Sequence, residues 1–165
     1  GLLPTRAKPV QDTPTPSPNG VAGIVLARLH ELTGDARWKE GGEELLRAFA
    51  GRSSELGLYA ATYMLAVDWH VNPAAHLVVV GEPDDPVAGA MHRRALAGFL
   101  PRRVVQWIAP ARAGSQPLPP VLRGMVAAGR APRGYACVGT SCGQPAEEPS
   151  VWAATLESLR PTVPA

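Results

Sequence analysis

The sequence is short of lysine and of aromatic residues. Lys8 and Lys39 are the only lysines among its 16 basic residues, aromatic residues make up 5% of the chain, and the formal net charge is +2. A nucleic-acid-binding surface clusters basic side chains on one element and interleaves aromatics with them. The arginines here are scattered instead, so we predict no nucleic-acid partner.

Long hydrophobic runs and a cysteine framework are also absent. Apolar runs such as residues 21–27 are far shorter than the roughly 20 residues that a membrane helix needs. The first residues, GLLPTRAKPV, do not have the charged and apolar regions of a secretory signal. Two cysteines in 165 residues do not make a disulfide scaffold. We therefore expect no membrane partner and a reducing cytoplasm.

No complete cofactor or metal motif is present. The G-x-G-x-x-G and P-loop patterns are missing, and a zinc site would need about four ligands at suitable spacing. The four histidines are dispersed, and each is expected to be a surface or half-buried helix residue: His30, His70, His76 and His92. We expect neither a metal nor a cofactor.

What the chain does have is enough apolar material for a core, interrupted by many turns. Hydrophobic residues make up 45% of the 165 residues, and there are 17 glycines and 18 prolines. This composition fits one ordinary domain or the end of a larger one. Turns and irregular connections are expected between the elements.

The hydrophobic period divides the chain into segments, because it changes near residue 74 from helical to strand spacing. We predict a mixed α/β fold: about three antiparallel helices, then a small parallel βαβ-type sheet of two to three strands and a final helix. The expected segments are a connector (1–17), helical hairpins (18–73), a βαβ unit (74–109), a proline-rich loop with a short helix (110–133), and a strand, cysteine loop and last helix (134–165).

The helical half has three apolar stripes. Gly41 and Gly42 lie inside the second helix, where close packing of a neighbouring helix best explains them. The third helix is predicted to start near Ser53 or Ser54. The residues expected to face the core are Ala22, Val25, Leu26, Leu29 and Leu32; then Trp38, Leu45, Leu46 and Phe49 after an N-cap at Asp35; then Leu56, Tyr59, Ala60, Tyr63, Met64 and Val67.

In the second half, β-branched runs at 76–80 and 103–108 flank a helix that starts after Asp85, with Pro86 at its first position. This order predicts parallel strands with a right-handed crossover. The helix is expected to bury Val87, Met91, Leu96 and Phe99. Further elements are expected at 121–128 (helix), 135–138 (strand) and 150–160 (helix, with Val151, Trp152, Leu156 and Leu159 on its apolar face).

The stretch QDTPTPSPNG holds the strongest candidate site. Ser17 before Pro18 has the arrangement of an N-cap followed by proline at the first helical position, which is a structural role. Asp12 and Asn19 lie close to the same helix start, where a carboxylate and an amide are able to bind a polar ligand. The alternative is a solvated loop acid and a first-turn asparagine.

Cys137 and Cys142 are separated by four residues, on and just after the predicted strand 135–138. A thioredoxin-type redox pair has two intervening residues, so a buried strand cysteine and a loop cysteine is the favoured interpretation. A reversible disulfide remains open, because a turn is able to bring the two Cα atoms within about 6 Å.

Several motifs in order resemble one family. They are D-x-x-x-P-S-x-N-G before an apolar helix (12–20), LTGD (32–35), EELLRAF (43–49), HLVVVGEPDDP (76–86), FLP (99–101) and Y-A-C-x-x-x-x-C-G-Q-P (135–145). From Asp12 to about Leu159, the chain resembles the C-terminal region of the YyaL / spermatogenesis-associated protein 20 family, whose members carry a thioredoxin-like domain and a six-hairpin (α/α)6 toroid of the glycosidase type.

The resemblance implies that this chain holds the last helices of the toroid and its closing α/β elements, with an upstream thioredoxin-like domain and the remaining toroid as partners in the same protein. Asp12, Ser17 and Asn19 would then lie at the toroid rim, near a polar small molecule or sugar. Two hypotheses follow: a fragment of a carbohydrate-related enzyme, or a non-catalytic module that completes the toroid and docks the thioredoxin-like domain. Either leaves an apolar helical face without neighbours.

Overall fold

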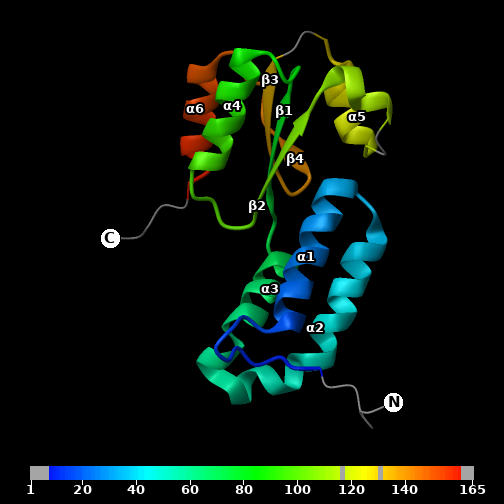
Figure 1. The fold of residues 1–165 in the computed structure, drawn as a ribbon, viewed down its shortest axis with the longest axis vertical. Coiled ribbons are helices and arrows are strands. Elements are labelled where there is room, and N and C mark those ends of the chain that lie inside the picture. Colours follow the sequence, from blue (N-terminus) through cyan, green and yellow to red (C-terminus); the bar gives the residue numbers. More distant parts are fainter. Residues whose placement is uncertain (1–7, 116–117, 130–131, 161–165) are drawn as a thin grey trace. The chain divides into compact units, whose positions relative to one another are not determined.

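A computed structural model describes residues 8–115, 118–129 and 132–160 (Figure 1). The chain forms two compact units, which are considered one at a time. Among the described residues, the first unit contains 8–30 and 35–72, and the second contains 31–34 and those from 73 to 160. In the described ranges, none of the helices is long and apolar enough to cross a membrane.

The first unit is built from three helices: α1 (Pro18–Thr33), α2 (Ala36–Leu56) and α3 (Ala61–Val71), with a 3-10 turn η1 (Gly57–Ala60) before α3. Asp35 caps α2 as the sequence predicted, because its side chain accepts a hydrogen bond from the backbone N–H of Arg37 at 3.0 Å.

The predicted start of the third helix was wrong. The helix that begins at Ala36 continues through Ser53, whose hydroxyl donates to the carbonyl of Ala50 within the same helix. The helix ends where Gly57 takes a positive φ of 54°, a conformation that glycine adopts without strain. The third helix therefore starts at Ala61, eight residues later than Ser53.

Small residues, rather than the predicted large ones, form the tightest contacts of α1. Its buried residues are Gly20, Gly23 and Ala27, whereas Val25 is exposed. A Cβ atom added to Gly23 would lie only 2.9 Å from the Cβ of Ala66 in α3. The helices approach so closely that larger side chains are excluded from this contact.

Gly42 has a similar explanation, and here the prediction of a close neighbour is confirmed. The imidazole ring of His70 occupies the space that a Cβ on Gly42 would take. Its Nε2 also lies 3.0 Å from the backbone carbonyl oxygen of Gly23. His70 of α3 thus contacts both of the other helices. Gly41 has no such neighbour within 4 Å, so close packing does not explain it.

Contacts along the helices give their directions. Gly42 and Leu46 of α2 meet His70 and Tyr63 of α3, so these two helices are antiparallel. Along α1 the order is the reverse. Gly20 lies against Thr62 and Gly23 against Ala66, so α1 and α3 run parallel to each other.

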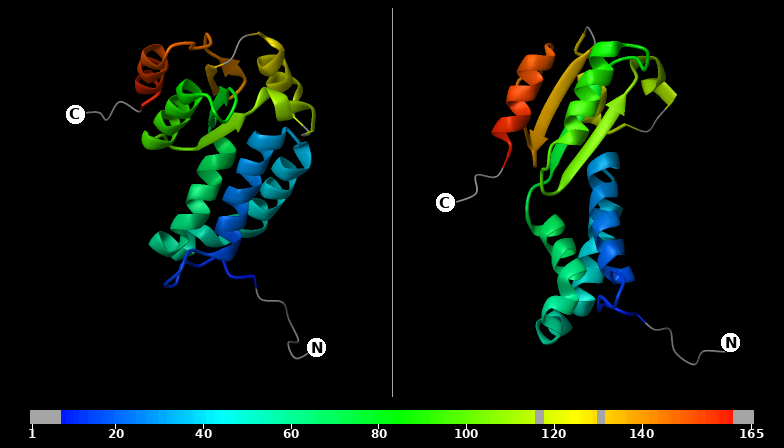
Figure 2. Two further views of the ribbon diagram at one scale, coloured as in Figure 1. Left: turned by 45° about the horizontal axis from the view of Figure 1, so that its top comes forward. Right: turned by 60° about the vertical axis from the view of Figure 1, so that its left-hand side comes forward.

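The second unit is a mixed four-stranded sheet with helices on both faces. The elements are β1 (Ala75–Val80), α4 (Pro86–Ala97), β2 (Arg103–Ile108), η2 (Pro110–Ser115), α5 (Pro120–Ala127), β3 (Arg133–Val138), β4 (Ser141–Cys142) and α6 (Pro149–Ser158). The strand order is β2-β1-β3-β4. Figures 1 and 2 show α4 and α6 along one face and α5 on the other.

The predicted βαβ unit is confirmed. Strands β1 and β2 are parallel, in register from Ala75↔Arg103 to Val80↔Ile108. Asp85 caps α4 by accepting hydrogen bonds from the N–H groups of Val87 and Ala88 at 2.8 and 3.2 Å. The third strand also forms, but it lies antiparallel to β1 on its other edge.

Alternate residues of β1 supply two cores. Leu77 and Val79 belong to a cluster with Met91 of α4 and Trp152 of α6, while Val78 and Val80 belong to a cluster on the other face that includes Leu122 of α5.

The predicted inner face of α4 was partly wrong. Met91 is buried, but Phe99 is 79% exposed and Leu96 is half exposed, because Ala88 and Ala95 make the close contact instead. In α6, Trp152 and Leu156 are buried as expected and Val151 is exposed.

Candidate functional site

The carboxylate of Asp12 joins two helix starts in the first unit. One oxygen, Oδ1, accepts a hydrogen bond from the backbone N–H of Ser17 at 2.7 Å. The other, Oδ2, accepts one from the N–H of Thr62 at 2.8 Å. The N–H of Asp12 itself donates to the carbonyl of Tyr59 at 2.7 Å. Two of these hydrogen bonds tie the loop before α1 to η1 and the beginning of α3, and the third, from Ser17, orders the loop itself.

Electrostatics follow from these contacts. The Thr62 amide is the main cause that lowers the pKa of Asp12 below its ordinary value of 3.8; burial opposes this, and the Ser17 amide lowers the pKa further. A general acid at neutral pH needs a raised pKa instead. Asp12 is thus an ionised carboxylate with a hydrogen bond to each oxygen.

Ser17 has the structural role that its position before Pro18 predicted. It is fully buried, and its hydroxyl oxygen accepts a hydrogen bond from the N–H of Gly20 at 3.2 Å. This is the N-cap interaction that satisfies one of the free N–H groups at a helix start. A Cβ on Gly20 would lie 2.6 Å from that same hydroxyl oxygen, so the cap also needs glycine at this position.

Asn19 faces an open groove on the first unit. The groove has a volume of about 490 Å³ and runs between the loop before α1 and one side of α2. Its polar lining residues are Lys8, Asn19 and Glu44, accompanied by Pro9, Pro18, Gly41, Leu45 and Ala48. The amide nitrogen of Asn19 donates to the carbonyl of Pro9 at 2.6 Å.

The three candidate residues of the N-terminal loop are thus brought together, but they do not share one cavity. Asn19 lines the groove, whereas Asp12 and Ser17 do not. Lys8 and Glu44 were not predicted, because no motif connects them. Thr62 was not predicted either, because it lies 50 residues from Asp12. Within the described ranges, no three or more His, Cys, Asp and Glu residues gather as a metal site.

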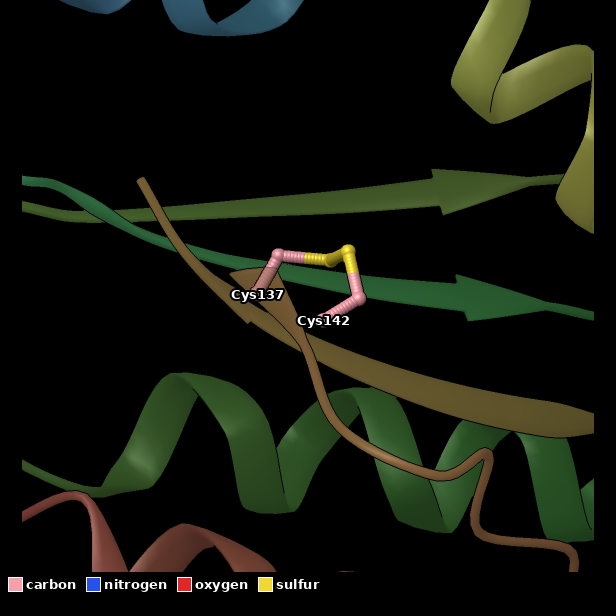
Figure 3. Close-up of a disulfide and its surroundings, with 2 residues drawn as sticks. All are labelled: Cys137 and Cys142. Carbon is pink, nitrogen blue, oxygen red and sulfur yellow. A yellow bond between two sulfur atoms is a disulfide. The ribbon is translucent and has the colours of Figure 1, made fainter. Parts of the chain in front are cut away.

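The two cysteines are joined, contrary to the favoured sequence interpretation of an unpaired strand cysteine and loop cysteine. A disulfide links Cys137 of β3 to Cys142 of β4, with their Cα atoms 4.0 Å apart (Figure 3). The residues are direct partners in the antiparallel register of a short hairpin. The turn between them contains Gly139 with a φ of 57°. This turn brings the two cysteines together, and so forms the disulfide that their spacing in the sequence had left as an open alternative.

Comparison with known proteins gives one informative similarity. No family model matches the chain, and no solved structure matches it. The chain is 29% identical over 103 residues to spermatogenesis-associated protein 20 of Rattus norvegicus, a match that covers 62% of this chain and 13% of that protein. This similarity supports a relationship between the chain and the family of spermatogenesis-associated protein 20.

Proposed function

We propose that the chain is a structural and interaction module of a longer protein: it supplies the last helices of an (α/α)6 toroid and an α/β unit that docks an upstream thioredoxin-like domain. The main support for this proposal is the hydrogen bonding of the Asp12 carboxylate. Its two carboxylate oxygens each accept a backbone N–H, so the residue that best resembles a catalytic acid holds two helix starts together.

The arrangement of the three helices supports the toroid. Hairpin toroids are built from helices of two layers, in which members of one layer run parallel and members of the other run the opposite way. Here α1 and α3 are parallel neighbours and α2 is antiparallel to α3. The 13% coverage of the relative supports the view that most of such a toroid lies outside this sequence.

Exposed apolar side chains on these helices support the same proposal. Val21 and Val25 lie one helical turn apart on α1, and Met64 and Leu65 are neighbours on α3. All four are more than 40% exposed. Where exposed apolar side chains adjoin one another, they mark an interaction surface. We assign it to contact with the preceding helices of the longer protein.

The test compares one substitution in chains of two lengths. In the 165-residue chain, Val25→Lys should change the free energy of unfolding by less than about 0.5 kcal/mol, because the site is exposed. In the longer protein it should cost about 1–3 kcal/mol, because a charge would be buried. Chemical denaturation of both lengths measures this difference. Equal, small effects in both would refute the proposed cover.

A second candidate is the binding of a polar small molecule such as a sugar, and the groove of about 490 Å³ favours it. Asn19, Lys8 and Glu44 offer hydrogen-bonding groups beside the apolar stem of Leu45. In this version, Asp12 and Ser17 hold the loop that carries Asn19. In this candidate function, the ligand is carbohydrate-related and the protein works in the cytoplasm. Any enzyme activity would belong to the whole, longer protein.

Calorimetry on the longer protein with a panel of neutral sugars tests this candidate. Asn19→Ala and Glu44→Gln should each weaken binding by about tenfold, the cost of one hydrogen bond to a ligand. Glu40→Gln, on an exposed part of the same helix, is the matched control and should bind as the wild type does. Binding that is the same in all three variants would exclude the groove.

A further inference from the structure

The hairpin that carries the disulfide is short and self-contained. Strand β4 has only two residues, and its register partners are Cys137↔Cys142 and Val138↔Ser141. The disulfide closes a loop with a sequence separation of five residues. Cross-links that close short loops stabilise a fold less than those that close long ones. The position suggests a bond whose cleavage the fold tolerates.

The chain on both sides of the hairpin is fixed by other contacts. Before the turn, β3 pairs with β1 along its length, including Cys137 with His76. After the turn, Ala146 is buried and exchanges two backbone hydrogen bonds of 2.8 Å with Gly134. The N–H of Gly143 donates to the carbonyl of Ala136 at 3.0 Å. These contacts do not involve the sulfur atoms, so we expect them to persist when the S–S bond is broken.

The two sulfur-bearing residues differ in accessibility. Cys142 is exposed, whereas Cys137 is only 6% exposed and packs in an apolar cluster with Val78 and Tyr135. Thiol–disulfide exchange requires a thiolate to approach a sulfur atom directly. An incoming thiolate therefore reaches the bond from the side of Cys142.

We propose that Cys137 and Cys142 form a reversible dithiol–disulfide couple that exchanges with external thiols at Cys142. A thiolate of the reductant attacks Sγ of Cys142, the S–S bond breaks, and Cys137 leaves as a thiolate that takes up a proton. A second thiol of the reductant then attacks the mixed disulfide. Cys142 is released as a thiol, and the reductant is oxidised to its own disulfide.

The reverse reaction is favoured by the same hairpin. Because backbone pairing holds the two residues as cross-strand partners, the reduced thiols remain adjacent. The thiolate of Cys142 attacks glutathione disulfide, whose S–S bond breaks and releases one glutathione thiolate that takes up a proton. The thiolate of Cys137 then attacks Sγ of Cys142 and releases the second glutathione in the same way. The reductant of this disulfide is a thiol, which either a small molecule or a protein supplies. The couple is independent of the toroid, so it is testable apart from the proposed function.

The first experiment uses the wild-type chain under native conditions. Excess dithiothreitol, a dithiol, should yield two alkylatable thiols per chain while the far-ultraviolet circular dichroism stays unchanged. Removal of the dithiol and addition of glutathione disulfide should restore the bond. In a separate arm, reduced glutathione alone shows whether a monothiol is sufficient or a dithiol is required. A bond that is reduced only when the chain unfolds would overturn the proposal.

The second experiment identifies the attacked sulfur. In Cys137→Ser, glutathione disulfide should add one glutathione at Cys142. In Cys142→Ser, the buried Cys137 should react at least about tenfold more slowly than Cys142 does in Cys137→Ser, because burial limits the approach of the disulfide. Peptide mapping of mixed disulfides trapped on the wild-type chain gives the same information if a variant is unstable. Adducts found mainly on Cys137 would contradict the assignment.

Discussion

Replacement of Asp12 by alanine removes the acceptor that both helix starts share. Two backbone N–H groups, of Ser17 and Thr62, lose their partner at once. A hydrogen bond to a charged group contributes about 1.5–3 kcal/mol to stability. Because Asp12 is only half-buried, water replaces part of this loss. We therefore expect Asp12→Ala to lower the free energy of unfolding by about 2–4 kcal/mol.

Asp12→Asn separates the two contacts. The asparagine keeps one carbonyl oxygen, but its NH₂ group faces the second backbone N–H and cannot accept from it. The loss should be about half of that for alanine, or roughly 1–2 kcal/mol. Glu40→Ala, at an exposed position in α2, is the control and should stay within about 0.5 kcal/mol of the wild type.

The pH dependence of stability gives an independent readout. The folded pKa of Asp12 lies below its ordinary value of 3.8, so the unfolded chain binds a proton more readily than the folded chain. The stabilisation is complete above the unfolded pKa and is lost as the pH falls through the folded pKa. In Asp12→Asn this part of the acid-induced loss should disappear.

The assays are urea denaturation and backbone amide hydrogen exchange. In Asp12→Ala, the Thr62 amide should exchange about 30- to 700-fold faster, because the expected loss of about 2–4 kcal/mol corresponds to one factor of ten per about 1.4 kcal/mol. A change below about 0.5 kcal/mol together with an unchanged exchange rate at Thr62 would refute the reasoning. It would mean that water replaces the carboxylate without cost.

Two pairs of neighbouring residues give further predictions for chemical denaturation. Gly42→Ala should lower the free energy of unfolding by about 1–3 kcal/mol, because the added Cβ would overlap the ring of His70. Gly41→Ala, with open space around it, should stabilise α2 by up to about 1 kcal/mol. Equal effects of the two substitutions would contradict the packing described for His70. Asp85→Ala should lower the free energy of unfolding by about 1 kcal/mol, because α4 loses its N-cap. Asp84→Ala, at an exposed position, is the control and should leave the stability unchanged. An unchanged stability in Asp85→Ala would show that the cap does not contribute.

Local chemistry made several features predictable. Ser17, Asp35 and Asp85 cap helices because a short polar side chain before a helix accepts the free N–H groups of its first turn. The strand at 103–108 and the parallel βαβ unit follow from the period of the apolar residues and the length of the crossover. These signals act over a few residues, so the sequence shows them directly.

Features that depend on distant partners were not predictable. The side of α1 that is buried depends on how closely Ala66 of α3 approaches Gly23. One partner of Asp12 is an amide 50 residues away, and β3 pairs antiparallel with β1 on the edge opposite β2, a pairing between segments more than 50 residues apart. Periodicity identifies an apolar stripe but not the distance of its neighbour, so large residues were wrongly expected to be buried in α1 and α4.

The sequence by itself determined the helix starts at Ser17, Asp35 and Asp85 and the segments that form the three longer strands. The tertiary structure decided what the helix entry at residues 12–19 does: it directed the carboxylate of Asp12 to two amides and left Asn19 at the groove. It also joined Cys137 to Cys142. The physical reason is the separation in sequence between the interacting residues. A cap or a turn depends on atoms of neighbouring residues, whereas a shared acceptor or a cross-strand bond forms only after distant segments have packed.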